Sequence, residues 1–551
     1  MLLFNDLMEK IFETAKQAVP GLEKRDIDID KSGHADFSLM LFRISKQHNK
    51  SPEELYDRIR NALNGLEFIG GIARVGNYVN FSIKPETYFK EIEESLQVKG
   101  QYPDIFQDPE RVSVEHTSAN PTGPLHVGRA RNSIIGDSTA RLLERYGYRV
   151  TTQYFINDSG KQMLFLYEGH KRFSKELNEN ALLEGYREIY TKVREDPGIE
   201  DSIKSLTERY EKGDNELIDE IHEIASIMLE GIKKSLKDIG IEHNDYTFES
   251  DFIRSGEIDH ILEGMEEHLK DEDGALYVEL PNERKIFLKR RDGTSLYFAR
   301  DIAYHLYKLQ NYDWLVNILG EDHKLHGTSL QYVLRNMLDI ENRIDITYYG
   351  FVRLESGKMS TRKGNVVSLP GLIERMNEES YDIVKEKRPD LEEETLKSIS
   401  EAVAASSIRF NIIRVGANKS MIFKWSEALN FEGDSAPFIM YSYARASSIL
   451  RKVEGSQKPV SIEFNKYEGD LLRQMYFYPY HLIQATKSLR PDIIANYSLS
   501  LVKKFNDFYS NCTVLDEDSD VRNRRLELVK MYKNILQDSC KIIGIKLLEE
   551  M

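Results

Sequence analysis

Hydrophobic and polar residues repeat with two different periods along the chain, and this pattern divides it into regions. Helical periodicity runs through the start and through SPEELYDRIRNALNGL, whereas IARVGNYVNFSI alternates like a strand with one buried face. Residues 1–105 are therefore predicted to form a small α/β module. Its first helix carries Asp6, Glu9 and Glu13 within the apolar pattern, which indicates an amphipathic helix and not a signal peptide.

Short apolar strands followed by helices dominate residues 106–370. RVSVEH and RVTTQYFI are predicted strands on either side of a helix that ends before Gly147, and the apolar run WLVNILG is typical of a strand buried on both faces. GALYVEL and KIFLKR continue the strand pattern. This alternation predicts a split Rossmann-type, doubly wound parallel sheet. Residues 165–245 interrupt it as a polar helical insertion, whose charge runs indicate solvated helix faces.

The rest of the chain is predicted to be helical. Residues 371–430 form a helical linker, and residues 431–551 form an all-α C-terminal domain. At 551 residues the chain is too long for one hydrophobic core, so a multidomain α/β protein is expected. No window approaches the roughly 18 uninterrupted apolar residues that a membrane span needs, so no membrane partner is expected.

Composition and charge narrow the class of protein. The net charge of −16 argues against indiscriminate binding of polyanions. Residues 431–551 hold 17 Lys and Arg against 16 Asp and Glu, so this region is +1 while the remainder is −17. RNA would meet the least repulsion there. The two cysteines, Cys512 and Cys540, favour a reducing, cytoplasmic location without disulfides or a cysteine zinc site.

The stretch PTGPLHVGRARN, from Pro121 to Asn132, is a turn rich in Pro and Gly that leads directly into a helix. A helix N-terminus offers unpaired N–H groups and a positive dipole end, which suit a phosphate. Gly128 allows a ligand close to the backbone, and His126 can donate to a phosphate oxygen. Taken alone, such a histidine more often caps a helix than binds a ligand.

In a second stretch, GKMSTRKGN from Gly357 to Asn365, two glycines flank Lys358, Ser360, Arg362 and Lys363. Such a loop can close over a polyphosphate. Taken alone, it is more often an exposed hairpin turn. The two stretches lie on either side of the predicted split sheet, which strengthens the phosphate interpretation of both.

Three side chains suggest a pocket for a cationic group. Tyr297 and Asp301 in SLYFARDIAYH are four residues apart and so share a helix face. Glu115 ends the RVSVEH strand, where ligands of open α/β sheets gather. A carboxylate is the preferred planar acceptor for a guanidinium. The alternative is that Asp301 only pairs with a basic neighbour such as Arg300.

In its motifs the chain resembles the class I aminoacyl-tRNA synthetases. Their HIGH signature is similar to His126-Val127-Gly128-Arg129, and their KMSKS signature to Lys358-Met359-Ser360-Thr361-Arg362. The contexts VEHTSANPTGPLHVGRARN, YFINDSGKQ, SLYFARDIAYH and IIGIKLLEEM resemble the arginyl-tRNA synthetase family in order along nearly the whole chain. The helical tail resembles that family's anticodon-binding bundle, and the first hundred residues resemble its add-on domain that touches the tRNA elbow.

The resemblance implies a site as well as a fold. Glu115, Ser118 and Asn120 would hold the backbone end of arginine, Tyr297 and Asp301 the guanidinium, and Asp322 or His323 would complete the pocket. The ATP and catalytic residues implied are His126, Gly128, Arg129, Lys358, Met359, Ser360, Arg362 and Lys363. ATP would carry Mg²⁺, no metal is expected on the protein itself, and His305 and His326 are expected to be structural.

Two positions depart from the family pattern. Arg129 replaces the second histidine of HIGH, and its permanent charge can still donate to phosphate. Thr361 replaces the second lysine of KMSKS, and Gly123 stands where some family members carry a compensating lysine. Arg362 and Lys363 are the nearest substitutes.

The implied reaction is ATP-dependent activation of arginine and its transfer to tRNA-Arg by a monomeric enzyme, with activation dependent on bound tRNA. Of the many aromatic residues in the helical tail, Tyr443 and Tyr497 are selected as RNA contacts. Three alternatives stay open: a class I synthetase for another amino acid, a non-catalytic tRNA-binding relative, and a small-molecule nucleotidylyltransferase that would not need the helical tail.

Overall fold

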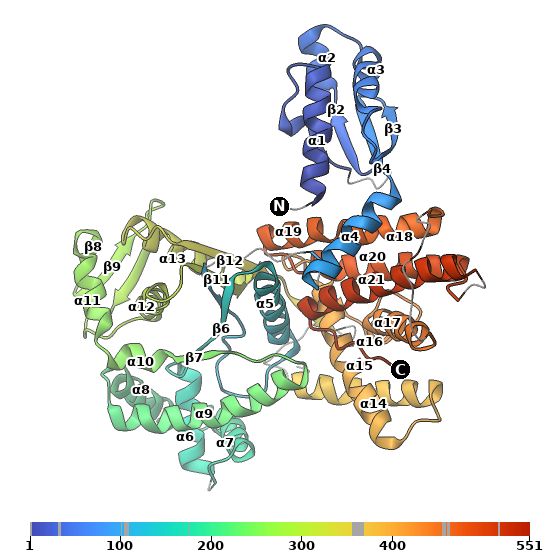
Figure 1. Ribbon diagram of the computed structural model, residues 1–551. Helices are drawn as coiled ribbons and strands as arrows, with labels where there is room; N and C mark the ends of the chain where they lie inside the picture. Colours follow the sequence, from blue (N-terminus) through green and yellow to red (C-terminus); the bar gives the residue numbers. More distant parts are fainter. Residues whose placement is uncertain are drawn as a thin grey trace.

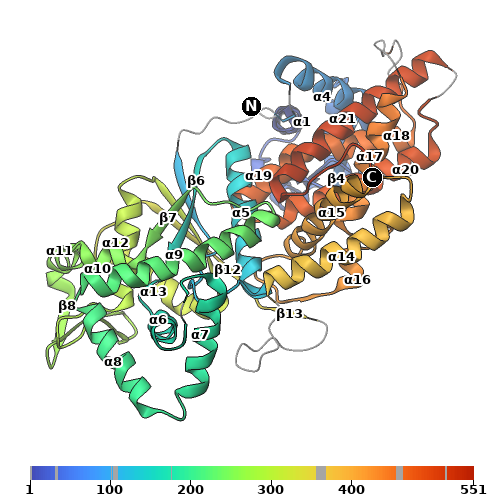
Figure 2. The same cartoon turned by 90° about the horizontal axis from the view of Figure 1, so that it is seen from below.

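The structure is a computed structural model that describes residues 3–30, 35–100, 102–103, 110–174, 176–354, 368–453, 459, 463–515 and 518–551. Figure 1 shows an N-terminal module at the top, a sheet-containing region on the left and a helical bundle on the right. One helix, α5 (Val127–Tyr146), stands between the sheet and the bundle. The view from below in Figure 2 shows the same division, so α5 separates the two parts in both directions.

The N-terminal module is an antiparallel sheet packed against helices. Within its described residues the strand order is β1-β2-β4-β3, and every pair is antiparallel. Ser51 caps α3 by accepting a hydrogen bond from the Glu54 N–H at 3.1 Å, and Pro52 occupies the first helical position. The elements are α1 (Leu3–Ala18), β1 (Ile27–Ile29), β2 (Phe37–Met40), α2 (Phe42–His48), α3 (Pro52–Leu63), β3 (Ile69–Val75), β4 (Tyr78–Ile83) and α4 (Pro85–Lys99).

The region on the left of Figure 1 is built on a parallel sheet, as the alternating pattern predicts. Its strands are β5 (Arg111–Glu115), β6 (Arg149–Ile156), β7 (Asp245–Phe248), β11 (Trp314–Gly320) and β12 (Arg343–Tyr349). Among the described strands the order is β12-β11-β5-β6-β7, and all neighbours are parallel. The chain order therefore reverses between β5 and β11. In open α/β sheets, ligands bind beyond the carboxyl ends of the strands at this switch point.

Two other units are inserted into this sheet. The first is helical, with α6 (Lys161–Phe173), α7 (Glu179–Lys192), α8 (Pro197–Glu211) and α9 (Asn215–Asp238). The second contains α10 (Glu249–Arg254), α11 (Glu257–Gly264), β8 (Leu269–Glu272), β9 (Ala275–Glu279) and β10 (Lys285–Lys289). GALYVEL and KIFLKR were expected to continue the parallel sheet, but they form β9 and β10 of a separate antiparallel sheet. Short strands of either sheet have the same local pattern, so sequence periodicity does not distinguish them.

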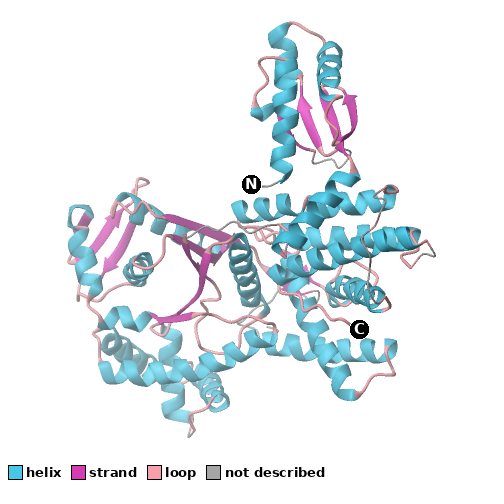
Figure 3. Ribbon diagram, in the orientation of Figure 1, coloured by secondary structure: helices cyan, strands magenta, loops and turns pink. Residues whose placement is uncertain are grey.

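Two helices, α12 (Tyr297–Leu309) and α13 (Lys324–Asn336), pack against this sheet, and the chain after β12 is mainly helical. The exception is a short parallel pair, β13 (Val352–Leu354) with β14 (Met421–Phe423). Figure 3 shows helices alone in the C-terminal bundle as drawn. The helices are α14 (Leu369–Lys387), α15 (Glu393–Ile413), α16 (Trp425–Ala428), α17 (Ala436–Arg451), α18 (Lys466–Tyr476), α19 (Tyr478–Ser488), α20 (Asp492–Asn511) and α21 (Ser519–Ile543).

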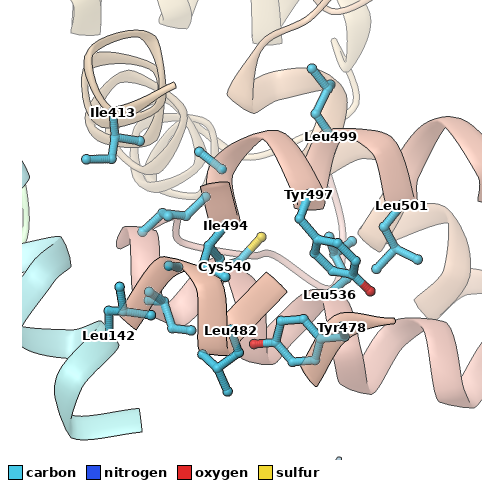
Figure 4. Close-up of a cluster of buried hydrophobic side chains, with 14 of the residues drawn as sticks. Leu142, Ile413, Tyr478, Leu482, Ile494, Tyr497, Leu499, Leu501, Leu536 and Cys540 are labelled. Carbon is cyan, nitrogen blue, oxygen red and sulfur yellow. The ribbon is translucent and has the colours of Figure 1, made fainter. Parts of the chain in front are cut away.

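One apolar cluster runs from the N-terminal module through α5 into the bundle, whereas each inserted unit has a core of its own. Figure 4 shows Leu142 of α5 near Leu482 of α19, with Leu536 of α21 in the same cluster. Because α5 is embedded on this side, its first turn is held in a fixed place relative to the bundle. In the described part of the chain no helix is both long and apolar enough to cross a membrane.

Candidate active site

The switch point carries polar side chains from both of its strands. Glu115 is the last residue of β5, and it lies opposite Asn317 of β11 in the parallel register. Both side chains are buried, although they stand at the end of the sheet where a ligand would bind. Buried polar groups need hydrogen-bond partners, and both of these side chains accept a hydrogen bond from Lys308 Nζ.

The loop after β5 has an unusual backbone. Thr117 and Ser118 have φ angles of 70° and 33°, a left-handed conformation that a β-branched residue rarely adopts. The Thr117 N–H donates to Asn132 Oδ1 at 2.5 Å, which holds the loop against α5. The Ser118 hydroxyl donates to Glu115 Oε1 at 3.0 Å. Strain that is fixed in this way is common at functional sites.

Asn120, further along the same loop, is exposed. Its side-chain amide donates to Gln162 Oε1 at 3.3 Å, at the start of the helical insertion. Ser118 is therefore in direct contact with Glu115, whereas the described contacts of Asn120 lead to α6.

The first motif forms the N-terminus of α5. His126 is the N-cap residue, and its Nδ1 accepts a hydrogen bond from the Arg129 N–H at 3.3 Å. Burial, and then the charge of Arg129, lower the pKa of His126, so the ring is neutral near pH 7. The first turn contains Gly128 and Arg129, both partly exposed. The neutral imidazole of His126 and the guanidinium of Arg129 thus lie at the positive end of a 20-residue helix.

The second motif lies outside the described residues. This applies to Lys358, Met359, Ser360, Arg362 and Lys363, and to Thr361. The chain that follows it returns to the first motif: Ser368 pairs with His126 as an isolated bridge, and the Leu369 N–H donates to the Leu125 carbonyl at 2.6 Å. The chain that follows the second motif is therefore held by backbone contacts beside the start of α5.

Tyr297 and Asp301 lie on α12 as predicted, but their partners differ from those expected. His326 Nε2 of α13 lies 2.5 Å from Asp301 Oδ2, and its ring stacks on Tyr297 with centroids 5.4 Å apart. His305 Nδ1 lies 3.1 Å from Asp301 Oδ1. Burial alone would raise the pKa of Asp301, but its contacts with the two histidines outweigh this and hold that pKa well below its usual range.

Arg300 is not the partner of Asp301. Its guanidinium is buried and donates to Glu249 at 2.9 Å and to the Ser159 hydroxyl at 2.8 Å. Successive residues of a helix point about 100° apart, so Arg300 faces α10 while Asp301 faces the switch point. The described partners of the Asp301 carboxylate are therefore His305 and His326.

Asp322 and His323 occupy a short turn directly after β11. Both are exposed, and their side chains lie 3.8 Å from each other. Among the described side-chain contacts neither reaches Tyr297 or Asp301, and His326, one turn further along, does so instead. The role predicted for Asp322 and His323 stays a prediction, and the residue of this segment in contact with Tyr297 and Asp301 is His326.

Sequence analysis missed two residues of this cluster and assigned His305 and His326 only structural roles. Lys308 is fully buried with its Nζ 2.7 Å from Glu115 Oε2, and His305 links it to Asp301. Asn317 is the other missed residue. The spacing of 301, 305 and 308 along α12 places all three on one helix face, so helical periodicity applied to charged residues would have found Lys308.

The two selected RNA contacts are corrected by the structure. Tyr443 is 3% exposed and Tyr497 2% exposed, so neither ring offers a face to a base. The Tyr443 hydroxyl donates to Glu549, and the Tyr497 hydroxyl to the Gln474 carbonyl. Figure 4 shows Tyr497 inside the apolar cluster beside Tyr478. Both are core residues. The sequence did not show this, because the spacing of aromatic residues along a helix does not reveal which face is buried.

Other aromatic residues of the bundle are exposed. Tyr441 is 46% and Tyr509 41% exposed, and the Arg445 guanidinium lies 5.0 Å and 4.8 Å from their ring centroids. Tyr441 borders two neighbouring cavities of about 630 and 330 Å³, and Tyr509 borders the smaller one. The lining of the larger one includes Lys387, Arg388, Phe438, Tyr441, Arg445 and Met551. Exposed rings beside basic groups are typical of single-stranded nucleic-acid sites.

Within the described residues no group of three or more His, Cys, Asp or Glu side chains could hold a metal ion. The groups described at the site are carboxylates, imidazoles, an ammonium and a helix N-terminus. Such a set can hold a cationic side chain and place an anion beside it.

Comparison with known proteins identifies three domains. Family models match residues 5–83 as "Arginyl tRNA synthetase N terminal domain", 91–425 as "tRNA synthetases class I (R), catalytic domain", and 439–551 as "DALR anticodon binding domain". A curated arginine–tRNA ligase of Thermoplasma acidophilum is 48% identical over the full length of both chains. One from Archaeoglobus fulgidus is 37% identical over 95% of this chain and 96% of that one.

Solved structures agree with the sequence relatives. Arginyl-tRNA synthetase of Thermus thermophilus superposes over 100% of both chains with a TM-score of 0.83 and 25% identity. That of Plasmodium falciparum superposes over 100% of both chains with a TM-score of 0.82 and 18% identity, which shows a shared fold.

Proposed function

The chain belongs to the arginyl-tRNA synthetase family and is an arginine–tRNA ligase, and from this premise we propose which of its residues carry out the reaction. The arginine carboxylate attacks the α-phosphate of ATP, so that a C–O–P bond forms and pyrophosphate leaves. A terminal ribose hydroxyl of tRNA-Arg then attacks the arginyl carbonyl, and AMP leaves. The protein accelerates both steps by positioning and by electrostatic stabilisation.

The guanidinium is bound by Asp301, with Tyr297 beside it. The support is the position of a partly buried carboxylate at the switch point, held from two sides by His305 and His326. These contacts leave further lone pairs of the carboxylate for a two-point contact with a planar cation. A neutral side chain of similar size would leave this carboxylate buried without a cation, which disfavours the alternative amino acids.

Glu115 belongs to the guanidinium end of arginine in this proposal, rather than to its α-amino end. Its carboxylate is joined to Asp301 through Lys308 and His305, all on the side of α12. The backbone end of arginine is assigned to Asn120, with Ser118 between the two ends.

ATP is bound at the start of α5. His126, Gly128 and Arg129 are assigned to its phosphates, together with the basic residues Lys358, Arg362 and Lys363 of the second motif. The backbone contacts of Leu125 and His126 with Leu369 and Ser368 support this pairing, because they fix where the second segment re-enters the fold. Mg²⁺ accompanies ATP and neutralises phosphate charge.

The tRNA is bound through the bundle and the N-terminal module, in the cytoplasm. Tyr441, Arg445 and Tyr509 are proposed to contact bases of the anticodon loop, because the two rings are exposed, Arg445 is a basic group beside them, and all three lie in the least acidic part of the chain. They replace Tyr443 and Tyr497 in this role.

The test is arginine-dependent exchange between ATP and pyrophosphate, measured with and without tRNA-Arg. We expect exchange only with tRNA, and we expect Asp301→Asn to lower kcat/KM for arginine at least roughly 100-fold, since losing a charged partner costs about 3 kcal/mol. Asp238→Asn, an exposed aspartate at the end of α9, is the matched control. Normal use of arginine by the Asp301 variant would refute the pocket. Binding of tRNA without any exchange in the wild type would favour a non-catalytic relative.

A further inference from the structure

Lys308 carries a charged group in a place where charge is expensive. It is 0% exposed, at the base of the arginine pocket. Its Nζ donates to Glu115 Oε2 at 2.7 Å and to Asn317 Oδ1 at 3.2 Å, and it lies 4.2 Å from the centroid of the Tyr304 ring. A buried ammonium destabilises a protein unless it is paired and hydrogen-bonded. An apolar residue would fill this part of a core with less difficulty, so the charge calls for a functional explanation.

The partner of Lys308 is equally well enclosed. The Glu115 carboxylate is buried, with one oxygen bound by Lys308 and the other accepting from Ser118 at 3.0 Å. The Phe155 N–H donates in turn to the Ser118 hydroxyl at 3.2 Å, which fixes its position. Glu115 is therefore held in one orientation and its charge is balanced locally.

The same ammonium is connected to Asp301. The Asn317 amide donates to His305 Nε2 at 2.9 Å, and the Lys308 Nζ lies 3.5 Å from that nitrogen. His305 Nε2 is thus an acceptor, and its Nδ1–H is left to face Asp301, 2.8 Å from the carbonyl and 3.1 Å from Oδ1. Lys308 and Asn317 together set which imidazole nitrogen carries the proton toward Asp301.

We propose that Lys308 is a positioning residue of the arginine pocket, which neutralises Glu115, orients His305 and leaves Asp301 as the carboxylate that a substrate cation must balance. This inference rests on the proposed arginine pocket. Among the acidic and lysine side chains of this cluster, Glu115, Asp301 and Lys308 sum to a single negative charge. One bound guanidinium compensates that negative charge, whereas a neutral side chain leaves it uncompensated.

The first test replaces Lys308 with methionine, which keeps the length of the side chain and removes its charge. Without the ammonium, Glu115 has no counter-ion and His305 loses one of the two groups that orient it, so Asp301 is no longer held as the carboxylate that binds the guanidinium. We expect KM for arginine to rise about 10- to 100-fold, as for loss of a charge-assisted hydrogen bond, with kcat of exchange within about threefold. KM values for ATP and tRNA should not change. Lys192→Met removes an exposed lysine of α7 and is the control.

The second test separates the role of Lys308 toward Glu115 from a general role in folding. Glu115→Gln and the double variant Glu115→Gln/Lys308→Met are compared in the same exchange assay. In the Glu115→Gln background the lysine has no carboxylate to neutralise and only its contact with His305 remains, so we expect its removal to raise KM for arginine clearly less than in the wild-type background. The neutral pair also removes the unpaired buried charge, so this comparison stands even where Lys308→Met alone does not fold.

Two results would overturn the proposal. One is a Lys308→Met enzyme with the wild-type KM for arginine. The other is a loss on removing Lys308 that is as large in the Glu115→Gln background as in the wild type. The wild-type enzyme distinguishes failure of the proposed function from failure of the role of Lys308. If the wild type shows no arginine-dependent exchange, the proposed function is contradicted, and not the role of Lys308.

Discussion

Asp158 is a carboxyl group for which the fold provides hydrogen bonds but little positive charge. It follows β6 and has no exposed surface. Ser250 donates to it from its backbone N–H at 3.0 Å and from its hydroxyl at 2.6 Å. Burial raises the pKa of Asp158 to about 7, although the bonds from Ser250 oppose this. The folded protein therefore keeps a proton there at pH values where the unfolded chain releases it.

This shift predicts how stability depends on pH. The unfolded value is about 3.9, so from about pH 4 to about pH 7 the folded state binds more protons than the unfolded state. The stabilising contribution is complete below about pH 4 and is lost as the pH rises through about 7, with a total on the order of 4 kcal/mol. Asp158→Asn should therefore flatten the fall in Tm between pH 5 and pH 8.

The measurement is a series of thermal melts of the wild type and the variant across that range. Asp238→Asn, at an exposed position, should keep the wild-type slope. Equal slopes for the wild type and Asp158→Asn would show that Asp158 is ionised throughout. Such a residue could not be found from sequence, because YFINDSGKQ gives no sign that its aspartate is enclosed by α10.

The helix α12 shows how far sequence reasoning reaches at the scale of one element. Its period places Tyr297, Asp301 and Lys308 along one side, and the structure agrees. The period cannot supply His326, which comes from α13, nor Glu115 from β5. Contacts between elements depend on the order of strands and on crossing angles, which local spacing does not contain. Asp322 and His323 are a further example, because local spacing did not show that both side chains are exposed.

The helix α17 carries the clearest prediction for tRNA binding, because two of its tyrosines face opposite ways. Tyr441 is exposed beside Arg445, whereas Tyr443 is buried and bonded to Glu549. Stacking of one base contributes about 1–3 kcal/mol, so Tyr441→Ala should raise KM for tRNA roughly 5- to 150-fold without changing KM for arginine. Steady-state aminoacylation measures both constants.

Tyr443→Phe is the matched control for that helix. It keeps the buried ring and removes only the hydroxyl, so KM for tRNA should stay at the wild-type value. A larger effect for Tyr443 than for Tyr441 would place the RNA elsewhere on the bundle.

At the scale of the whole molecule, α5 joins the site to the parts that bind tRNA. Its first turn holds His126, and its last turn holds Arg145, which donates to Asp538 of α21 at 2.8 Å. Between them the buried Arg409 of α15 contacts Asp137 of α5 and donates to the Ile543 carbonyl of α21 at 3.0 Å. The division into three parts was predictable from hydrophobic periods. These junctions were not, because each joins residues that are at least 134 positions apart in the chain.

The N-terminal module is docked on the bundle by a similar buried charge. Asp36 is 2% exposed and accepts from the Ile83 N–H at 2.6 Å, from the Tyr88 hydroxyl at 2.5 Å and from Arg473 Nε of α18 at 2.5 Å. Arg473 also donates to the Ala35 carbonyl. The only cation among these described partners of Asp36 thus comes from the other domain.

Arg473→Met should therefore loosen this docking. Removing one partner of a buried ion pair typically destabilises by about 3–5 kcal/mol, because the remaining charge is left uncompensated. The module then samples positions away from the bundle, which increases the radius of gyration in X-ray scattering and raises KM for tRNA. KM for arginine should remain unchanged, since the pocket lies in the other half of the molecule. Lys504→Met breaks an exposed pair with Asp470 and should have almost no effect. A compact Arg473 variant with normal KM for tRNA would mean that apolar contacts such as Phe37 with Phe477 hold the module in place by themselves.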